Sequence, residues 1–143
     1  MDRTQPTERV PRIGEIYNMR FEGTGSEQSG WRPGLVFQNN LGNEKSPNII
    51  ALPLTTAIKK RNMPTHVFLR ASENGLRRNS LMLCENPERM SKEKVGAYIT
   101  TLSDDEMREV ATANLIATAA ISFLDKESLL RTWEKAVRLN NPA

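Results

Sequence analysis

The sequence is poor in the residues on which several classes of protein depend. It has one cysteine, Cys84, and one histidine, His66, among 143 residues. A single cysteine excludes an internal disulfide, and the two residues together exclude the usual zinc clusters. No apolar run approaches the length of a membrane span, and the N-terminal stretch MDRTQPTERVPR lacks the apolar core of a signal peptide. We therefore expect a cytoplasmic protein without membrane contact.

The charge balance is mildly basic. Twenty lysines and arginines oppose 17 acidic residues, which gives a net charge of +3. This excess is smaller than the basic stripe of a dedicated DNA-binding protein. Two clusters, 59–61 and 77–78, concentrate positive charge; they fit a solvated surface, or a surface that faces a polyanion. At this length we expect one domain, residues 13–143, after a disordered lead of residues 1–12.

Short apolar stretches between polar turns predict β-strands. Residues 14–21 alternate in polarity, and residues 33–38 are almost continuously apolar. Pro33 marks the start of the second strand, and Pro53 indicates that its strand is an edge strand or contains a bulge. Strands are predicted at 14–21, 33–38, 48–55, 65–69, 79–84 and 95–102. Polar connections are predicted at 41–47 and 86–94, the second with room for one helical turn.

The last third of the chain changes to helical spacing. Ser103 and Glu106 form the capping-box pattern at the start of a helix predicted over 103–123. A second helix is predicted over 125–139, with an apolar stripe that packs on its own barrel, on a dimer partner or on another protein. The order of elements predicts a mainly β fold with C-terminal helices. A small barrel would pair the short strands without long exposed edges.

One short motif joins a polar loop to an apolar strand. In FEGTGSEQSGWRPGLVFQNN, residues 21–40, the triplet WRP separates a run rich in Gly and Ser from the apolar GLVF. The proline fixes the backbone beside Arg32 and the buried strand anchors it, so the guanidinium starts from a rigid element. Such an arginine suits the binding of a phosphate, or it caps a strand end at the surface.

This motif belongs to an ordered series that resembles the MazF/PemK toxins, small ribonucleases of bacterial toxin–antitoxin pairs. The series comprises residues 14–16, 25–33, 38–39, 51–56, 63–67, 75–81 and 102–107. The resemblance implies an SH3-like β-barrel of the MazF/CcdB type, usually a homodimer, restrained by an acidic antitoxin. It implies metal-independent cleavage of single-stranded RNA without a cofactor. In the family the 2′-hydroxyl attacks the adjacent phosphorus and leaves 2′,3′-cyclic phosphate and 5′-hydroxyl ends.

The resemblance also assigns catalytic roles. Arg32 would hold two oxygens of the transition-state phosphate, and Thr55 would donate a hydrogen bond to it, although a threonine is also an ordinary strand residue. Some members carry an acidic residue where Glu85 stands. Its carboxylate would either accept the 2′-hydroxyl proton or pair with Arg32. His66, the sole histidine, is expected on a strand remote from the loop and is interpreted as structural.

RNA recognition is expected around the loop. Residues that would contact RNA bases or fix the loop are Ser26, Glu27, Gln28, Trp31, Asn39 and Arg89. Trp31 would stack on a base or belong to the core. Two positions depart from the family: Glu88 stands where an arginine is frequent, with Arg89 one residue later, and Leu83 stands where some members have an arginine. These departures favour, as an alternative, a catalytically weakened module that binds an antitoxin; the fold alone would also suit a gyrase-poisoning toxin.

Overall fold

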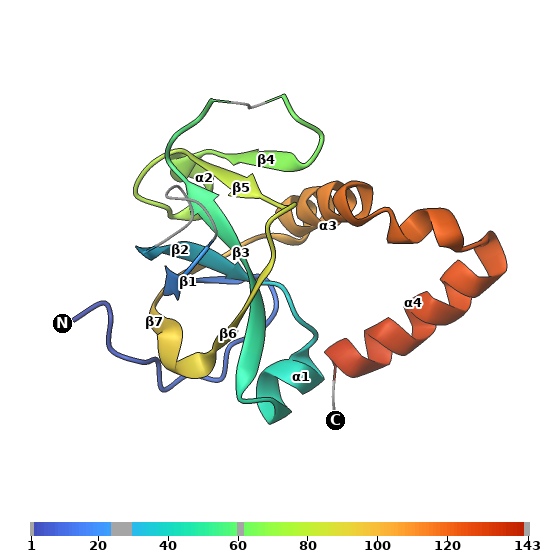
Figure 1. Ribbon diagram of the computed structural model, residues 1–143, viewed down its shortest axis with the longest axis horizontal. Coiled ribbons are helices and arrows are strands. Elements are labelled where there is room, and N and C mark those ends of the chain that lie inside the picture. Colours follow the sequence, from blue (N-terminus) through green and yellow to red (C-terminus); the bar gives the residue numbers. More distant parts are fainter. Residues whose placement is uncertain (1, 24–29, 60–61, 142–143) are drawn as a thin grey trace.

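The structure, a computed structural model, describes residues 2–23, 30–59 and 62–141, which form seven strands and several helices (Figure 1). The strands are β1 (Glu15–Phe21), β2 (Gly30–Val36), β3 (Asn48–Thr55), β4 (His66–Leu69), β5 (Ser80–Leu83), β6 (Glu88–Ser91) and β7 (Val95–Thr101). The helices are α1 (Asn40–Lys45), α2 (Ala71–Asn74), η1 (Lys92–Lys94), α3 (Asp104–Thr118), η2 (Ala120–Phe123) and α4 (Lys126–Asn140). Two of these elements, α1 and β6, lie where the sequence predicts polar connections.

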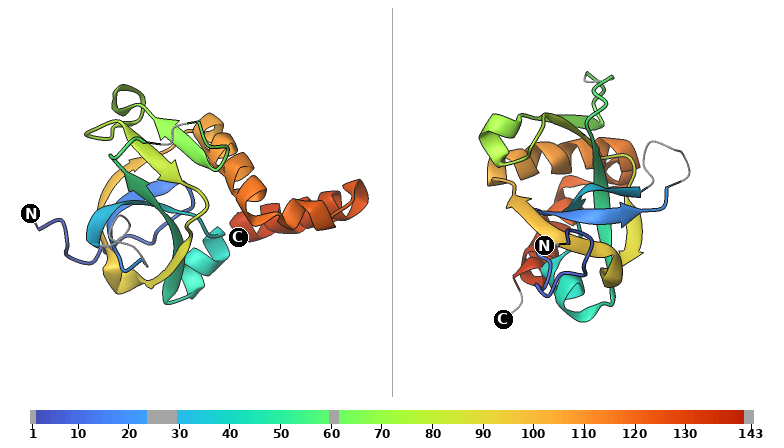
Figure 2. Two further views of the ribbon diagram at one scale, coloured as in Figure 1. Left: turned by 45° about the horizontal axis from the view of Figure 1, so that its top comes forward. Right: turned by 90° about the vertical axis from the view of Figure 1, so that its left-hand side faces the viewer.

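All seven strands join one antiparallel sheet. Their order is β4-β5-β3-β2-β1-β7, and β6 pairs with a separate stretch of β3. The sheet curls around itself (Figure 2). Its terminal strands β4 and β7 do not pair with each other within the described residues, so the barrel is not closed. Helices α3 and α4 follow the last strand. The predicted mainly β fold with C-terminal helices is confirmed.

Pro53 lies in a central strand, where the sequence suggested an edge or a bulge. One side of β3 pairs with β6 through residues 48–51 and with β5 through residues 54–55. Pro53 falls between these two ladders and faces Gly34 of β2 on the other side. A proline has no amide hydrogen to donate to a neighbouring strand. Between the β6 ladder and the β5 ladder, β3 has no partner on that side among the described residues, so no amide is needed there. The change of partner, rather than an edge, explains how the strand tolerates Pro53.

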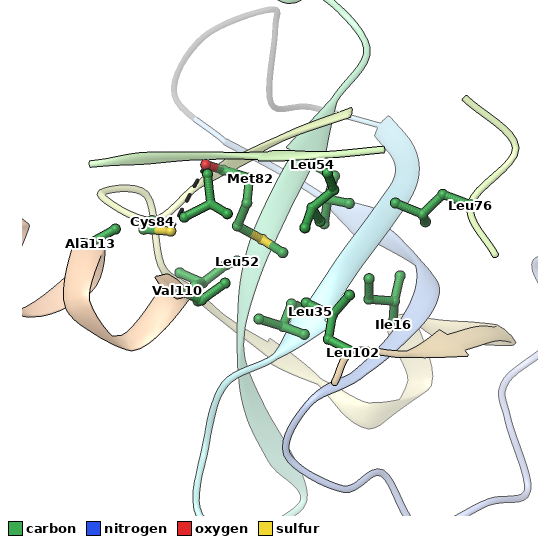
Figure 3. Packing of buried hydrophobic residues seen from close by; sticks show 12 residues of the cluster. Ile16, Leu35, Leu52, Leu54, Leu76, Met82, Cys84, Leu102, Val110 and Ala113 are labelled. Carbon is green, nitrogen blue, oxygen red and sulfur yellow. Dashed lines mark hydrogen bonds between the residues drawn. The ribbon is translucent and has the colours of Figure 1, made fainter. Parts of the chain in front are cut away.

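Two apolar clusters cover the two faces of the sheet. The first packs between the sheet and α3 (Figure 3) and contains Ile16, Leu35, Leu52, Leu54, Val67, Leu69, Leu76, Met82, Cys84, Leu102, Val110 and Ala113. The second contains Tyr17, Met19, Phe21, Val36, Ile49, Ala51, Met90 and Val95. Because side chains alternate along a strand, the neighbours Leu35 and Val36 enter different clusters. Burial on both faces accounts for the almost continuous apolar run in this strand.

Part of the N-terminal segment, expected as a disordered lead over residues 1–12, contacts β7 at Arg3, Thr7 and Arg9. The amide of Thr7 donates to the carbonyl of Val95 at 2.8 Å. The guanidinium carbon of Arg9 lies 3.9 Å from the ring centre of Tyr98, within the range of a cation–π contact. Backbone hydrogen bonds at Arg3 and Thr7, which residue types do not predict, hold this part of the segment against β7.

Helix α3 begins where the capping pattern predicts. The Ser103 hydroxyl accepts a hydrogen bond from the Glu106 amide at 3.1 Å, and the Glu106 carboxylate accepts one from the Ser103 amide at 2.9 Å. The helix ends at Thr118, earlier than predicted, because Ala119 adopts a left-handed conformation with φ 58°. A left-handed residue cannot continue a right-handed helix, so a separate short turn, η2, follows.

Helix α4 forms as predicted but does not pack on its own barrel. None of its residues is buried, and Trp133 is 62% exposed. The helix returns to the domain at its C-terminal end (Figure 1), where the Asn140 carbonyl accepts a hydrogen bond from the Asn40 side chain at 2.9 Å. In the described structure the barrel therefore does not cover the apolar stripe of α4, and the contact with the domain is made through α1. No helix in the described part of the chain is long and apolar enough to cross a membrane.

Candidate active site

Arg32 and Thr55, to which the family resemblance assigns the central chemistry, line the same hollow. Its volume is about 200 Å³. Other described residues around it are Trp31, Pro33, Leu54, Thr56 and Ser80. The hollow is thus built from the start of β2, the end of β3 and the first residue of β5. Two residues that are 23 positions apart in the sequence are brought to one place by the sheet.

The register of the sheet explains this meeting. Gly34 in β2 lies opposite Pro53 in β3. Continuing the register by two residues along each strand brings Arg32 opposite Thr55, and both then lie on the same face because side chains alternate. Gly34 lies on that face too, where an added Cβ would lie 2.6 Å from Cζ of Phe21. The absence of a side chain at position 34 lets the core approach the strand closely beside the arginine.

The two side chains offer complementary hydrogen-bonding groups. Both residues are half-buried. The Thr55 hydroxyl oxygen accepts a hydrogen bond from the Ala57 amide at 3.1 Å, which orients it and leaves its own hydrogen to donate. Arg32 carries a permanent positive charge on a planar group that binds two oxygens at once. The arrangement therefore suits an anion with several oxygens, of which a phosphate is the common biological case.

Trp31 connects this hollow to a neighbouring one. The second hollow has a volume of about 250 Å³ and includes Arg77 and Arg78. Trp31 lines both hollows, and it is 40% exposed. This exposure decides against the core interpretation of the tryptophan. A partly exposed ring between two cationic hollows is suited to stack on a nucleic-acid base.

Glu85 and Arg89 lie in a different hollow, of about 520 Å³, which also includes Pro53. Oε2 of Glu85 lies 2.6 Å from Nε2 of His66. The ion pair with Arg32 that the sequence suggested is therefore replaced by a pair with His66. The sequence did not indicate this contact, since 19 positions separate the two residues and a lone histidine has no characteristic spacing.

Glu88 fastens the start of the loop between β1 and β2. Its two carboxylate oxygens accept hydrogen bonds from the amides of Glu22 and Gly23, each at 3.0 Å. The Glu22 carboxylate in turn pairs with Lys94. The residue that departs from the family pattern thus has a definite structural role. Sequence analysis missed this role, because a carboxylate that binds backbone amides more than 60 positions away leaves no local pattern.

Of the remaining residues predicted to contact RNA, Asn39 is placed by the structure away from Arg32. The Asn39 side chain accepts a hydrogen bond from the Gly42 amide at 2.8 Å and caps α1. It follows the C-terminal end of β2, whereas Trp31 lies at the other end. Ser26, Glu27 and Gln28 lie outside the described residues. The structure therefore supports Trp31 as a neighbour of the site and gives Asn39 a capping role.

Cys84 is buried between the sheet and α3 (Figure 3). Burial, with a smaller contribution from the negative charge of Glu85, raises the pKa of the thiol to about 12. A thiol that keeps its proton at neutral pH is a poor nucleophile and a poor metal ligand.

Among the residues that the structure describes, no group of three or more His, Cys, Asp and Glu side chains is placed to hold a metal ion.

Comparison with known proteins identifies the family. Residues 12–117 match the model of the PemK-like, MazF-like toxins of type II toxin–antitoxin systems. The chain belongs to the PemK/MazF toxin family. Endoribonuclease EndoA of Bacillus subtilis (strain 168) is 41% identical over 115 residues, which cover 80% of this chain and 99% of that protein. Endoribonuclease MazF of Staphylococcus saprophyticus is 39% identical over 103 residues, covering 71% of this chain and 86% of that one.

Solved structures of PemK/MazF toxins share the fold. MazF from Deinococcus radiodurans superposes with a TM-score of 0.67 at 22% identity, covering 78% of this chain and 99% of that one. A mycobacterial endoribonuclease in complex with its cognate antitoxin gives a TM-score of 0.64 at 25% identity, covering 77% and 96%. The matched region of the family ends at residue 117, so α4 and the first eleven residues lie outside it.

Proposed function

We propose that this PemK/MazF-family chain is the toxin of a toxin–antitoxin pair and an endoribonuclease that cuts single-stranded RNA without a metal ion. The 2′-hydroxyl gives up its proton and attacks the adjacent phosphorus, the bond from phosphorus to the 5′-oxygen breaks, and the 5′-oxygen takes up a proton. The products carry 2′,3′-cyclic phosphate and 5′-hydroxyl ends. The observation that carries the proposal is the shared hollow of Arg32 and Thr55. The names of its relatives support the same activity.

The proposed chemistry depends on charge stabilisation. During in-line attack, negative charge builds on the phosphorus-bound oxygens. Arg32 holds two of these oxygens and Thr55 donates to one, from positions fixed by β2 and β3 before the substrate arrives. Loss of one preorganised donor of this kind lowers the rate by about 100-fold to 1,000-fold. Arginine serves here as a permanent cation rather than as a base, because its pKa is too high for easy proton transfer.

The transfer of protons from the 2′-hydroxyl and to the 5′-oxygen is left to groups other than Arg32 and Thr55. Glu85 was the predicted acceptor for the 2′-hydroxyl proton. Its Oε2 is taken by His66 and it borders a different hollow from Arg32, so we assign it primarily to positioning His66. The partners proposed from family membership are a second copy of the chain and an acidic antitoxin, supported by the solved toxin–antitoxin complexes of similar fold.

The decisive experiment incubates the purified protein with a long RNA in EDTA and maps the new ends. We expect cuts at a short sequence, with 5′-hydroxyl ends, and a 100-fold or greater loss in Arg32→Ala and Thr55→Val. Arg32→Lys should recover little, because an ammonium cannot make the paired contact. Arg131→Ala and Thr112→Val, on α4 and α3, are matched controls. Retained antitoxin binding with no cutting by the wild-type protein would instead support the weakened module.

A further inference from the structure

The hollow beside Trp31 gathers positive charge from distant parts of the chain. Its described lining includes Arg3, Arg32, Arg77 and Arg78, and no acidic residue. Six ion pairs join described residues elsewhere, and none of them involves Arg3, Arg77 or Arg78. Among the described residues no carboxylate pairs with Arg3, Arg77 or Arg78, and their like charges repel one another, so these three arginines favour an anionic ligand.

Arg3 lines this hollow from the N-terminal segment, whose backbone is held in place by hydrogen bonds. The Arg3 carbonyl accepts hydrogen bonds from the Ala97 amide and the Asn18 side chain, both at 3.1 Å. Gly96 allows the two backbones to approach this closely, because an added Cβ there would lie 2.3 Å from the Arg3 carbonyl oxygen. The segment is therefore held here by its backbone, and Arg3 is one of the residues that line the hollow. Arg3 lies outside the region shared with the family.

Two larger hollows of the molecule have a different electrostatic character. The hollow of about 520 Å³ is lined by Glu22, Glu85 and Glu88 together with Arg89 and Lys94. The hollow of about 840 Å³, beside α3, is lined by Asp105, Glu106 and Glu109 together with Arg108 and His66. The three carboxylates in each hollow weaken its attraction for a polyanion. The hollow lined by Arg3 is smaller than both, but all its described charged residues are positive. It adjoins the proposed cleavage site, with which it shares Trp31, Arg32, Pro33, Thr56 and Ser80.

We infer that Arg3, Arg77 and Arg78 form a second phosphate subsite, which binds the RNA backbone one or more nucleotides away from the cleaved bond. The strand passes from the hollow of Arg32 and Thr55 into this one, and a base between the two stacks on Trp31. The subsite adds affinity for longer RNA without taking part in bond cleavage. This inference rests on the proposed function, since it extends the same RNA path.

RNA fits this hollow better than an acidic peptide does. Guanidinium groups bind both phosphates and carboxylates in pairs of hydrogen bonds, so charge alone does not separate the two ligands. The exposed ring of Trp31 lies in the same hollow, and a flat ring beside cations is the usual platform for a base of a single strand. Continuity with the Arg32 hollow gives a phosphate chain a direct path.

The test compares Arg3→Ala with Arg12→Ala, a matched exposed arginine of the same segment that does not line the hollow. Steady-state cleavage is measured on a long RNA and on an oligonucleotide trimmed to the cleavage sequence. Binding of the long RNA is measured over a salt series in a Thr55→Ala background. We expect Arg3→Ala to raise KM for the long RNA several-fold with kcat unchanged, and to leave the trimmed substrate unaffected. The slope of log K against log salt should fall by about 0.7, the value for one phosphate of a single strand.

The possible outcomes distinguish an RNA phosphate subsite from an antitoxin-binding surface and from failure of the proposed function. An Arg3→Ala protein with the wild-type salt slope and KM overturns the subsite while the nuclease stands. An equal loss on the trimmed substrate also overturns it, because the effect would then lie in the cleavage site. Weakened binding of an acidic antitoxin peptide with unchanged RNA binding assigns the hollow to that partner instead. A wild-type protein that neither binds nor cuts RNA removes the proposed function and the subsite together.

Discussion

His66 and Glu85 form a close pair beside strands β4 and β5, with Nε2 of the histidine 2.6 Å from Oε2 of the glutamate. The imidazole side chain is 8% exposed and the carboxylate 31% exposed. A hydrogen bond to an ionised group in such a setting contributes about 1.5–3 kcal/mol. The pair joins the first residue of β4 to the segment that follows β5, so it ties the terminal strand β4 to its neighbour.

The first prediction concerns this pair. Glu85→Gln and His66→Ala should each lower the free energy of unfolding, and a double-mutant cycle should give a coupling of about 1–2 kcal/mol, measured by denaturant titration. The exposed Glu93→Gln serves as the control. Cleavage by folded Glu85→Gln should stay within about tenfold of the wild-type rate. A loss above about 100-fold, together with disappearance of the acidic limb of the pH–rate profile, would assign the carboxylate to proton transfer.

The second prediction is a loss of stability in alkali that depends on Cys84. The thiol has a pKa of about 12 in the folded protein, against 9.0 for an exposed thiol. Between these values the unfolded chain has released a proton that the folded chain keeps, so stability falls as pH rises, by up to about 1.4 kcal/mol per pH unit. Urea titrations of Cys84→Ala over this range should show a shallower decline. Tyr17, whose burial also raises its pKa, is unchanged in both proteins, so the difference between them isolates Cys84.

The third prediction tests the packing beneath Arg32. In Gly34→Ala, the new methyl group would lie 2.6 Å from Cζ of Phe21 and 2.7 Å from Sδ of Met19. We expect a loss of about 1–3 kcal/mol in the free energy of unfolding. Gly34→Ala,Phe21→Leu, which makes room at the ring, should recover part of this loss. A Gly34→Ala protein as stable as the wild type would contradict the close approach.

The fourth prediction separates the two C-terminal helices by their caps. Ser103→Ala removes the cap of a helix that packs in the core, and should lower the free energy of global unfolding by about 1 kcal/mol. Asp125→Ala removes the equivalent cap from α4, which buries no residue. The global midpoint should then stay unchanged, while amide exchange in residues 126–140 becomes faster. Equal shifts of the midpoint in the two variants would show that α4 unfolds together with the barrel.

The sequence carries strong signals for elements whose side chains determine the structure. The strand predicted at 48–55 has the observed bounds, because its apolar residues are buried on both faces. The start of α3 follows from the Ser103 and Glu106 pattern, which is a local interaction. The pairing of Arg32 with Thr55 in one hollow was predicted through the family resemblance, since register between strands cannot be derived from residue types alone.

Other elements lack such signals. Strand β6 has four residues, of which one, Met90, is buried, so no alternation is visible. Helix α1 has six residues and is too short to show a helical period. Glu88 and Asn39 act by accepting hydrogen bonds from backbone amides. Every residue except proline has such an amide, so the sequence does not show which ones these side chains bind.

The backbone contacts that hold the N-terminal segment leave the side chain of residue 3 free to change during evolution. The contacts that hold residue 3 use its carbonyl oxygen and spare its side chain. An exchange of that side chain therefore leaves the anchoring of the segment intact while it changes the charge presented to a ligand. Under the inferred subsite, RNA affinity and the anchoring of the segment depend on different atoms of this residue, so selection can act on the first without eroding the second.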